Sequence, residues 1–327
     1  MNKIRIAIIG ASEIAYRRFM PALLKDDRFE YVGVAIEREQ DTERAKAFKR
    51  DYGGEIINGY DSAIYRNDID AIYVPQPPAL HFGFGKKVLE SQKHLFMEKP
   101  FTTSNKNSKT LIELASKNNL AVVENYMFRF HKQVERFIGL TKEGIVGKIN
   151  KFEIRFSFPQ RETTDFRYNK SLGGGALFDC GGYTIMLSDI LLERKGKIID
   201  FNSSFAEGFD VDVGGAGIME NDKCSCYFSF GMMHTYNCYA KAYGEKGILV
   251  APRVLTAPCD FDVKFDLLDL DGKLVKQMDV GCDDTFLKSI NNFYNCIVDE
   301  KMRKDNYNLI LRQSKMIEYV INFRGEY

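Results

Sequence analysis

Short apolar runs alternate with amphipathic stretches over the first third of the chain. The apolar runs have the length of buried strands, and they lie at Ile4–Ile9, Tyr31–Ile36, Ala71–Val74, His94–Met97 and Leu120–Val123. The stretches between them have helical spacing, and they lie at Ile14–Leu24, at 37–51, at Phe82–Ser91 and at Lys106–Asn118. Strands that alternate with helices predict a doubly wound, Rossmann-type parallel sheet covered by helices on both faces.

After Glu124 the hydrophobic rhythm changes to an alternation of period two. In Lys151–Phe158 every second residue is apolar, which predicts a strand with one buried face. Further strands are predicted at Lys197–Phe205, Gly214–Met219, Cys224–Phe230, Asn237–Tyr243, Ile248–Val250, Asp262–Leu267 and Lys273–Met278. Helices are predicted at Gln133–Leu140, at Gly181–Leu192 and, as a final pair, after a cap at Asp284 or Thr285.

The change of rhythm divides the chain into two predicted domains. We expect residues 1–122 to form a Rossmann domain, a fold that commonly binds dinucleotides. We expect residues 123–327 to form an α+β domain with a large, mostly antiparallel open sheet, whose outer face suggests self-association.

The composition is that of a globular protein without a polyanionic partner. The chain has 327 residues, with 46 Lys and Arg against 45 Asp and Glu and a net charge of +1. This balance gives no long-range attraction to nucleic acid or to an anionic membrane surface. No apolar run approaches the ~20 residues of a membrane span. The 7 cysteines follow no disulfide framework or zinc-ligand spacing, which favours a cytoplasmic protein without a metal.

The segment after the first strand is similar to a dinucleotide-binding loop. Such a loop needs a glycine for a tight turn and backbone N–H groups at a helix N-terminus for the pyrophosphate. Gly10 supplies the turn, Ala15 is small enough for close helix packing, and Ser12 replaces the usual second glycine with a hydroxyl that can donate to phosphate. We therefore expect Gly10, Ser12, Glu13 and Ile14 to bind the cofactor.

The residue that follows the second strand contacts the adenosine ribose in such folds. An acid there accepts a hydrogen bond from the 2′-OH of NAD, whereas an arginine pairs with the 2′-phosphate of NADP. The chain has both, as Glu37 and Arg38, so these residues leave the choice between NAD(H) and NADP(H) open. A solvated charge at a helix start explains Arg38 equally well.

Two later segments carry candidate chemistry for carbonyl reduction. The strand His94–Met97 ends in Glu98 and Lys99, and a lysine at the carboxyl end of a parallel strand can reach the nicotinamide end of the groove. On spacing alone, a surface lysine before a proline is the simpler interpretation. Downstream, Asp179 and Tyr183 are four residues apart and share a face if their segment is helical.

A carbonyl that is being reduced needs a proton for its developing alkoxide. A tyrosine beside a lysine ammonium can supply that proton, because the positive charge lowers the pKa of a phenol. Three consecutive glycines, at 173–175, precede Asp179 and Tyr183. Glycine is conformationally expensive, so this run indicates either the close approach of a ligand or a hinge.

Together these motifs resemble those of one oxidoreductase family. Glu98-Lys99-Pro100, the segment from Gly173 to Asp179 and Tyr183 are similar to the glucose–fructose oxidoreductase / inositol dehydrogenase / MocA family, over nearly the whole chain. Within that family, some segments resemble the sugar-nucleotide 3-ketoreductases of deoxysugar biosynthesis. They are Gly10–Leu23, Tyr73–His81, Asn125–Phe128 with His131, and Asp165–Tyr168.

The resemblance implies roles for individual residues. Lys99 orients the substrate carbonyl, Asp179 positions substrate hydroxyls, and Tyr183 is the general acid where many relatives have histidine. The implied cofactor groove adds Pro75, Gln76, His81, Glu98 and Lys99 to the residues named above. The implied substrate contacts are Lys99, Tyr126, Arg167, Tyr168, Asp179 and Tyr183.

The resemblance also bears on the cofactor, the backbone and the partners. It favours NADP(H) over NAD(H), it implies a cis peptide bond between Lys99 and Pro100, and it implies a homodimer or homotetramer through the C-terminal sheet. Gln76 and Ala79 depart from the commonest residues of the subgroup, which leaves the exact sugar open. A surface ion pair remains an alternative explanation of Arg167.

Three functions remain to be separated. The leading one is reduction of a keto group, at C3, of a nucleotide-linked deoxysugar with NAD(P)H. The second is oxidation of a free sugar, inositol or trans-dihydrodiol. The third is a non-catalytic NAD(P)-binding regulator, which would have no need of Lys99, Asp179 and Tyr183.

Overall fold

The computed structural model describes residues 3–323. Their contacts divide the chain into two compact units. The first unit comprises residues 3–126 and 286–314, and the second comprises residues 127–285 and 315–323. The division falls just after the predicted boundary at residue 122. It also returns a C-terminal helical segment to the first unit, which the sequence-based division did not anticipate.

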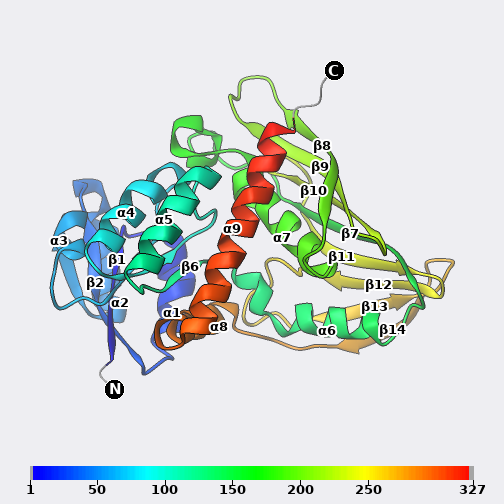
Figure 1. The fold of residues 1–327 in the computed structure, drawn as a ribbon, viewed down its shortest axis with the longest axis horizontal. Coiled ribbons are helices and arrows are strands. Elements are labelled where there is room, and N and C mark those ends of the chain that lie inside the picture. The colour runs from blue at the N-terminus through cyan, green and yellow to red at the C-terminus, as the bar shows by residue number, and fades with distance from the viewer. Residues whose placement is uncertain (1–2, 324–327) are drawn as a thin grey trace. The chain divides into compact units, whose positions relative to one another are not determined.

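The first unit is built on a six-stranded parallel sheet in the order β3-β2-β1-β4-β5-β6. Its residues 3–126 run from blue to cyan in Figure 1. Its strands are β1 (Ile4–Ile9), β2 (Phe29–Ile36), β3 (Glu55–Asn58), β4 (Ala71–Val74), β5 (His94–Met97) and β6 (Val122–Glu124). This is the strand order of a dinucleotide-binding Rossmann sheet, so the predicted fold is confirmed. The edge strand β3 was not predicted, because only Ile57 in it is buried and it leaves no apolar run.

Helices cover this sheet along the chain. A π-helical turn (Ala15–Phe19) leads into α1 (Met20–Leu23), and α2 (Thr42–Tyr52), α3 (Tyr60–Ile64), α4 (His81–Glu90) and α5 (Asn105–Lys117) follow. The short helix α3 was not predicted. The C-terminal helices are α8 (Thr285–Val298) and α9 (Glu300–Asn322). Asn306 and Tyr307 of α9 donate hydrogen bonds to the carbonyls of Val122 and Leu120, which ties this helix to β6.

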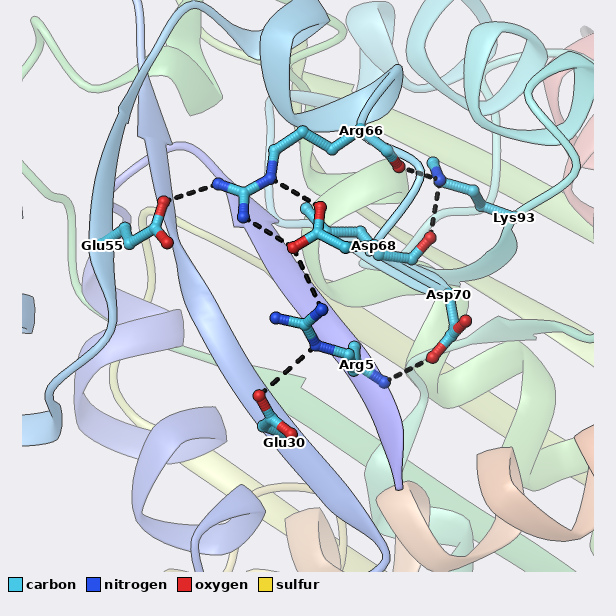
Figure 2. A network of polar contacts seen from close by, with 8 residues as sticks. Arg5, Glu30, Glu55, Arg66, Asp68, Asp70 and Lys93 are labelled. Carbon is cyan, nitrogen blue, oxygen red and sulfur yellow. Dashed lines mark hydrogen bonds and ion pairs between the residues drawn. The ribbon is translucent and has the colours of Figure 1, made fainter. Parts of the chain in front are cut away.

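Ion pairs join residues at the amino ends of the strands (Figure 2). Arg5, in β1, contacts Glu30 of β2 at 3.3 Å and Asp68 at 3.0 Å. Arg66 contacts Asp68 at 2.7 Å and Glu55 of β3 at 2.5 Å. The charges at the amino ends of the strands are thus paired within the unit. The candidate cofactor residues lie at the opposite end of the sheet, beyond the carboxyl ends of the strands.

The second unit is built on an eight-stranded sheet in the order β14-β13-β12-β11-β7-β10-β9-β8. Its strands are β7 (Ile149–Ser157), β8 (Lys197–Phe205), β9 (Asp212–Glu220), β10 (Ser225–Gly231), β11 (Asn237–Gly244), β12 (Gly247–Pro252), β13 (Lys264–Leu268) and β14 (Leu274–Asp279). All neighbouring pairs are antiparallel except β7 and β10, which confirms the predicted mostly antiparallel sheet.

One face of this sheet is covered by helices. Helix α7 (Gly182–Leu191) packs on β7 and β10, and α6 (Lys132–Lys142) contacts β12 (Figure 1). The period-two pattern of β7 buries Phe152, Ile154 and Phe156, whereas Lys151 and Glu153 between them are only partly buried. Among the described residues, no helix has the length and apolar character of a membrane span.

Candidate active site

The turn after β1 has the conformation that a dinucleotide-binding loop requires. Gly10 has a φ of 106°, which favours glycine. A Cβ at this position would lie 2.2 Å from Nε2 of Gln76, which donates a hydrogen bond to the carbonyl of Ile9 at 2.7 Å. Ser12 Oγ accepts a hydrogen bond from the N–H of Ala15 at 3.2 Å and so caps the helix that follows. Its hydroxyl hydrogen can still be donated to a phosphate.

The first turn of that helix contains two further predicted cofactor residues. Glu13 is exposed and pairs with Arg17 at 3.2 Å, while Ile14 is half-buried. The N–H groups at a helix start point out of the helix, so they suit an anionic ligand beside Gly10.

The end of β2 holds one arginine among acids. Arg38 is mostly exposed, and its Nε and Nη2 contact the two carboxylate oxygens of Asp41 at 2.9 and 3.1 Å. Asp41 is buried, and Glu37 is exposed beside it. The guanidinium fork that a 2′-phosphate would need is therefore already paired with a carboxylate.

A histidine holds the loop after β4 through hydrogen-bond contacts to two backbone carbonyls. His81 is fully buried, with Nδ1 2.7 Å from the carbonyl of Pro100 and Nε2 2.6 Å from the carbonyl of Gln76. Burial lowers the pKa of His81. We assign it the role of holding this loop, because its ring nitrogens face backbone carbonyls. Pro75 and Gln76 are partly exposed at the end of β4 and stay candidates for cofactor contact.

The end of β5 carries Lys99, and the peptide bond that follows it is cis, as predicted. The neighbouring Glu98 accepts hydrogen bonds from Tyr73 at 2.8 Å and from Asn125 at 2.7 Å. Asn125 in turn accepts a hydrogen bond from Ser289 of α8 at 2.8 Å. Desolvation raises the pKa of Glu98, although these hydrogen bonds and the charge of Lys99 act in the opposite direction. Glu98 thus fixes the backbone beside Lys99 from inside the unit.

In the second unit, the glycine run packs against its own chain. Gly173 has a φ of 76°, and a Cβ on Gly174 would lie 2.5 Å from the carbonyl oxygen of Arg167. Gly175 has a φ of 117°, and a Cβ there would lie 2.3 Å from a carboxylate oxygen of Asp212. Close packing within the unit therefore accounts for the run, and it needs neither a ligand nor a hinge.

The helix after these glycines begins with a π-helical turn, Leu177–Gly181, which contains Asp179 and precedes Tyr183 in α7. Such turns occur frequently at functional sites. Oδ2 of Asp179 lies 2.9 Å from Nε of Arg167, and Arg167 also pairs with Asp165 at 3.0 Å. The structure thus brings Arg167 and Asp179 together in one nearly buried charge cluster.

Tyr183 lies in an aromatic pocket of the same unit. Its side chain is buried, and its ring packs on Phe156 and Phe128 at centroid distances of 5.5 and 5.6 Å. Its hydroxyl donates to the sulfur of Met127 at 3.7 Å. A thioether is a weak acceptor, so a substrate oxygen can compete for this proton.

Two predicted substrate contacts are buried. The hydroxyl of Tyr168 donates to the carbonyl of Met232 at 3.2 Å and accepts from the N–H of Arg161 at 3.1 Å, so Tyr168 closes its loop. Tyr126 is completely buried in the first unit. An open cavity of about 620 Å³ lies beside Tyr168, and its lining includes Asp165, Lys170 and Ser171.

Sequence reasoning missed Asp212, which holds the start of the helix that carries Asp179 and Tyr183. Oδ2 of Asp212 accepts a hydrogen bond from the N–H of Leu177 at 2.7 Å. Burial raises the pKa of Asp212 to about 6. An aspartate at the start of a strand gives no sequence signal of such a long-range contact.

Each unit contains groups that suit the reduction of a carbonyl by a dinucleotide. The first offers a glycine turn and a helix N-terminus that fit a dinucleotide, with Lys99 at the carboxyl edge of the same sheet. The second offers a buried tyrosine hydroxyl and a carboxylate–guanidinium cluster. Within the described residues, no group of three or more His, Cys, Asp or Glu side chains is placed to hold a metal ion.

These features define a nicotinamide-dependent oxidoreductase. A family model described as an oxidoreductase family with an NAD-binding Rossmann fold matches residues 4–126. A model of the GFO/IDH/MocA C-terminal domain matches residues 135–250. The chain therefore belongs to the Gfo/Idh/MocA family of oxidoreductases, as the motifs predicted.

Two similar proteins are both named dTDP-3,4-didehydro-2,6-dideoxy-alpha-D-glucose 3-reductase. The chain is 31% identical to the Actinomadura kijaniata protein over 320 residues, which is 98% of this chain and 95% of that one. It is 29% identical to the Saccharopolyspora spinosa protein over 325 residues, or 97% and 96% of the two chains.

A solved structure extends the similarity to the fold. The crystal structure of a 3-ketoreductase from Actinomadura kijaniata in complex with NADP and TDP-benzene has a TM-score of 0.92, at 31% identity and 98% coverage of both chains. Structures of the same ketoreductase also exist with a tyrosine replaced by phenylalanine and with a lysine replaced by alanine or glutamate.

Proposed function

We propose that the protein reduces the C3 keto group of a nucleotide-linked deoxysugar with NAD(P)H. The observation that carries this proposal is the similarity, over 98% of both chains, to a 3-ketoreductase that binds NADP and a TDP compound. The relatives' name points to dTDP-3,4-didehydro-2,6-dideoxy-alpha-D-glucose as the first substrate to test.

The spacing of two residues supports the assignment of the catalytic groups. The lysine and the tyrosine replaced in the Actinomadura ketoreductase are as far apart along their chain as Lys99 and Tyr183 are here. We therefore assign these two residues to the carbonyl of the substrate.

The residues can perform the reduction as follows. Gly10, Ser12 and the N-terminus of the following helix would hold the dinucleotide by its pyrophosphate. When bound, the nicotinamide supplies the hydride that ends on the carbonyl carbon. The ammonium of Lys99 orients the carbonyl oxygen and stabilises the negative charge that develops on it. Tyr183 donates its phenolic proton to that oxygen, so a ketone becomes a secondary alcohol.

The test is turnover of the diketo sugar nucleotide named above with NADH and with NADPH. We expect the absorbance of the reduced cofactor to fall in step with a new alcohol at C3, identified by NMR of the product. A control in which dTDP replaces the sugar nucleotide should leave the absorbance unchanged. Oxidation of a free sugar, inositol or a dihydrodiol, without turnover of any nucleotide-linked ketone, would replace this proposal with the second candidate function.

We also propose that copies of the chain associate through the open face of the eight-stranded sheet, in a cytoplasmic setting. The polar and aromatic side chains of this face include Lys151, Glu153 and Tyr243, all partly buried within a single copy. All seven cysteines are free thiols, which suits a reducing compartment. Light scattering on the purified protein should give the mass of a dimer or tetramer, and a monomer mass would contradict this assembly.

A further inference from the structure

An arginine at the end of β12 has an unusual backbone and an unusual environment. Arg253 directly follows the strand and has a φ of 49°, a region that non-glycine residues rarely occupy. Its N–H donates a hydrogen bond to the carbonyl of Cys238 in the neighbouring strand β11 at 2.6 Å. Side chains held in this backbone region cluster at functional sites.

The guanidinium of Arg253 lies near two aromatic rings and has no counterion among the described residues. It lies 5.5 Å from the ring centroid of Tyr236 and 5.1 Å from that of Phe261. Among the described residues, no carboxylate is paired with it, and its buried Nε makes no hydrogen bond. Arg167 in the same unit, by contrast, pairs with two aspartates. A partly desolvated cation without a partner is suited to receive an anion.

A chain of contacts across neighbouring strands leads from Arg253 to Tyr183. Cys238 pairs with Phe156 across β11 and β7, and the ring of Phe156 packs on Tyr183. Burial raises the pKa of the Cys238 thiol, while hydrogen bonds to the thiol and the charge of Arg253 act against that rise. The register pairs Pro252 with Tyr239, and the N–H of Arg253 bonds to the carbonyl of Cys238, so the backbone of Arg253 lies beside the residue that pairs with Phe156. Two strand spacings, roughly 10 Å, separate β12 from β7.

We propose that Arg253 binds the diphosphate of the nucleotide-linked substrate. The inference rests on the proposed function, and it names the residue that distinguishes a nucleotide-linked sugar from a free one. The diphosphate of such a substrate begins at C1, two carbons from the C3 carbonyl assigned to Tyr183, so both groups can engage one molecule. The planar guanidinium offers two parallel N–H donors to phosphate oxygens, and the aromatic rings hold that plane in place.

The experiment is calorimetric titration of the protein with dTDP, UDP, GDP and thymidine. We expect at least one nucleoside diphosphate to bind, and Arg253→Gln to weaken its binding by about 10- to 100-fold, the effect of a lost charge-assisted contact. Arg253→Lys should lose less, because it keeps the charge but not the fork. NADPH affinity and thymidine binding should be the same in all variants, which also shows that each variant is folded.

Lys241→Gln is the matched control. Lys241 also places a cation over an aromatic ring, that of Tyr239 at 4.6 Å, but it alternates with the buried residues of β11 and so faces the opposite side of the sheet. The Lys241→Gln variant should bind dTDP as tightly as the wild type. If Arg253→Gln binds the nucleoside diphosphate as tightly as the wild type, Arg253 is not its receptor and the proposed reduction still stands. If the wild type binds no nucleoside diphosphate, both this inference and the nucleotide-linked substrate are wrong.

Discussion

The two ends of strand β5 show how one element serves two purposes. Lys93 directly precedes the strand and is buried, with Nζ donating to the carbonyls of Arg66 and Ile69 at 2.6 Å each (Figure 2). Lys99 follows the strand, beside the cis peptide bond and the buried hydrogen bonds of Glu98. Lys93 completes the interior of the fold, whereas Lys99 is the residue that we propose for the substrate carbonyl.

The same contrast extends across the whole sheet of the first unit. Where the strands begin, charges are paired and carbonyls are satisfied, as a purely structural edge requires. Where the strands end, Gly10 has a positive φ and desolvation raises the pKa of Glu98. Local features that oppose stability thus lie at the end of the sheet that holds the residues proposed for binding and chemistry.

The largest effect is expected from the lysine at the functional end. Lys99→Met should lower kcat by roughly 10²- to 10³-fold, because it removes the charge that stabilises the developing alkoxide. The melting temperature should stay that of the wild type, as measured by calorimetry. A variant with undiminished kcat would remove Lys99 from the reaction.

The lysine at the structural end should behave in the opposite way. Lys93→Met should lower the free energy of unfolding by about 1–3 kcal/mol, because two buried carbonyl groups lose their donor. Urea denaturation measures this loss, and kcat per folded molecule should not change. A loss of activity without a loss of stability in Lys93→Met would break the comparison between the two ends.

Asp212 extends the comparison to the second unit. Burial of its carboxylate lowers the stability of the folded state, while the hydrogen bond that it accepts from the N–H of Leu177 positions the helix of Tyr183. The folded-state pKa of about 6 lies above the ordinary value of 3.8, so the ionised carboxylate destabilises the native state. This destabilisation is complete above pH 6 and disappears as the pH falls below 3.8. Asp212→Asn should therefore be more stable than the wild type by about 1–3 kcal/mol at pH 8, with no gain near pH 3.

The same substitution should reduce turnover, by about 10-fold, because the neutral amide holds the helix start less firmly. The loss should appear in kcat rather than in KM. Asp222→Asn, an exposed aspartate beyond the other end of β9, is the control and should alter neither stability nor turnover. A destabilised Asp212→Asn with normal kcat would make Asp212 a structural residue only.

The smallest effect concerns the cofactor. Asp41→Asn should free the fork of Arg38 for a 2′-phosphate and raise the affinity for NADPH relative to NADH, by about 3- to 10-fold because Arg38 is mostly exposed. Glu37→Gln, which removes the exposed acid beside Arg38, should act in the same direction. Fluorescence titration with both cofactors measures the ratio, and an unchanged ratio in both variants would place the 2′-position elsewhere.

The elements of the fold that depend on a local hydrophobic pattern could be predicted from the sequence. Strands β1, β2, β4 and β5 were predictable because buried parallel strands are continuous apolar runs. Strand β3 and helix α3 were not, because they are short and β3 buries a single residue. The return of α9 to β6 depends on Asn306 and Tyr307, whose partners are distant in the sequence.

The candidate site was predictable in its residue types more than in their contacts. Gly10 and the cis bond after Lys99 follow the motifs in which they occur. The glycine run was interpreted as a ligand contact or a hinge, yet its neighbours are Arg167 and Asp212 of the same unit. His81 was expected to line the cofactor groove, which stays a prediction, and the contacts of its ring nitrogens with two backbone carbonyls were not foreseen. Such roles depend on neighbours that no local pattern specifies.

The most direct test of the proposed reaction is a single-turnover measurement on Tyr183→Phe with NADPH and the diketo sugar nucleotide. The substitution removes only the hydroxyl and keeps the ring packing on Phe156 and Phe128. We expect oxidation of bound NADPH to slow by roughly 10²- to 10⁴-fold, while the dissociation constants of both ligands stay close to those of the wild type. Oxidation at the wild-type rate would show that the proton comes from another group and would contradict the assignment of Tyr183.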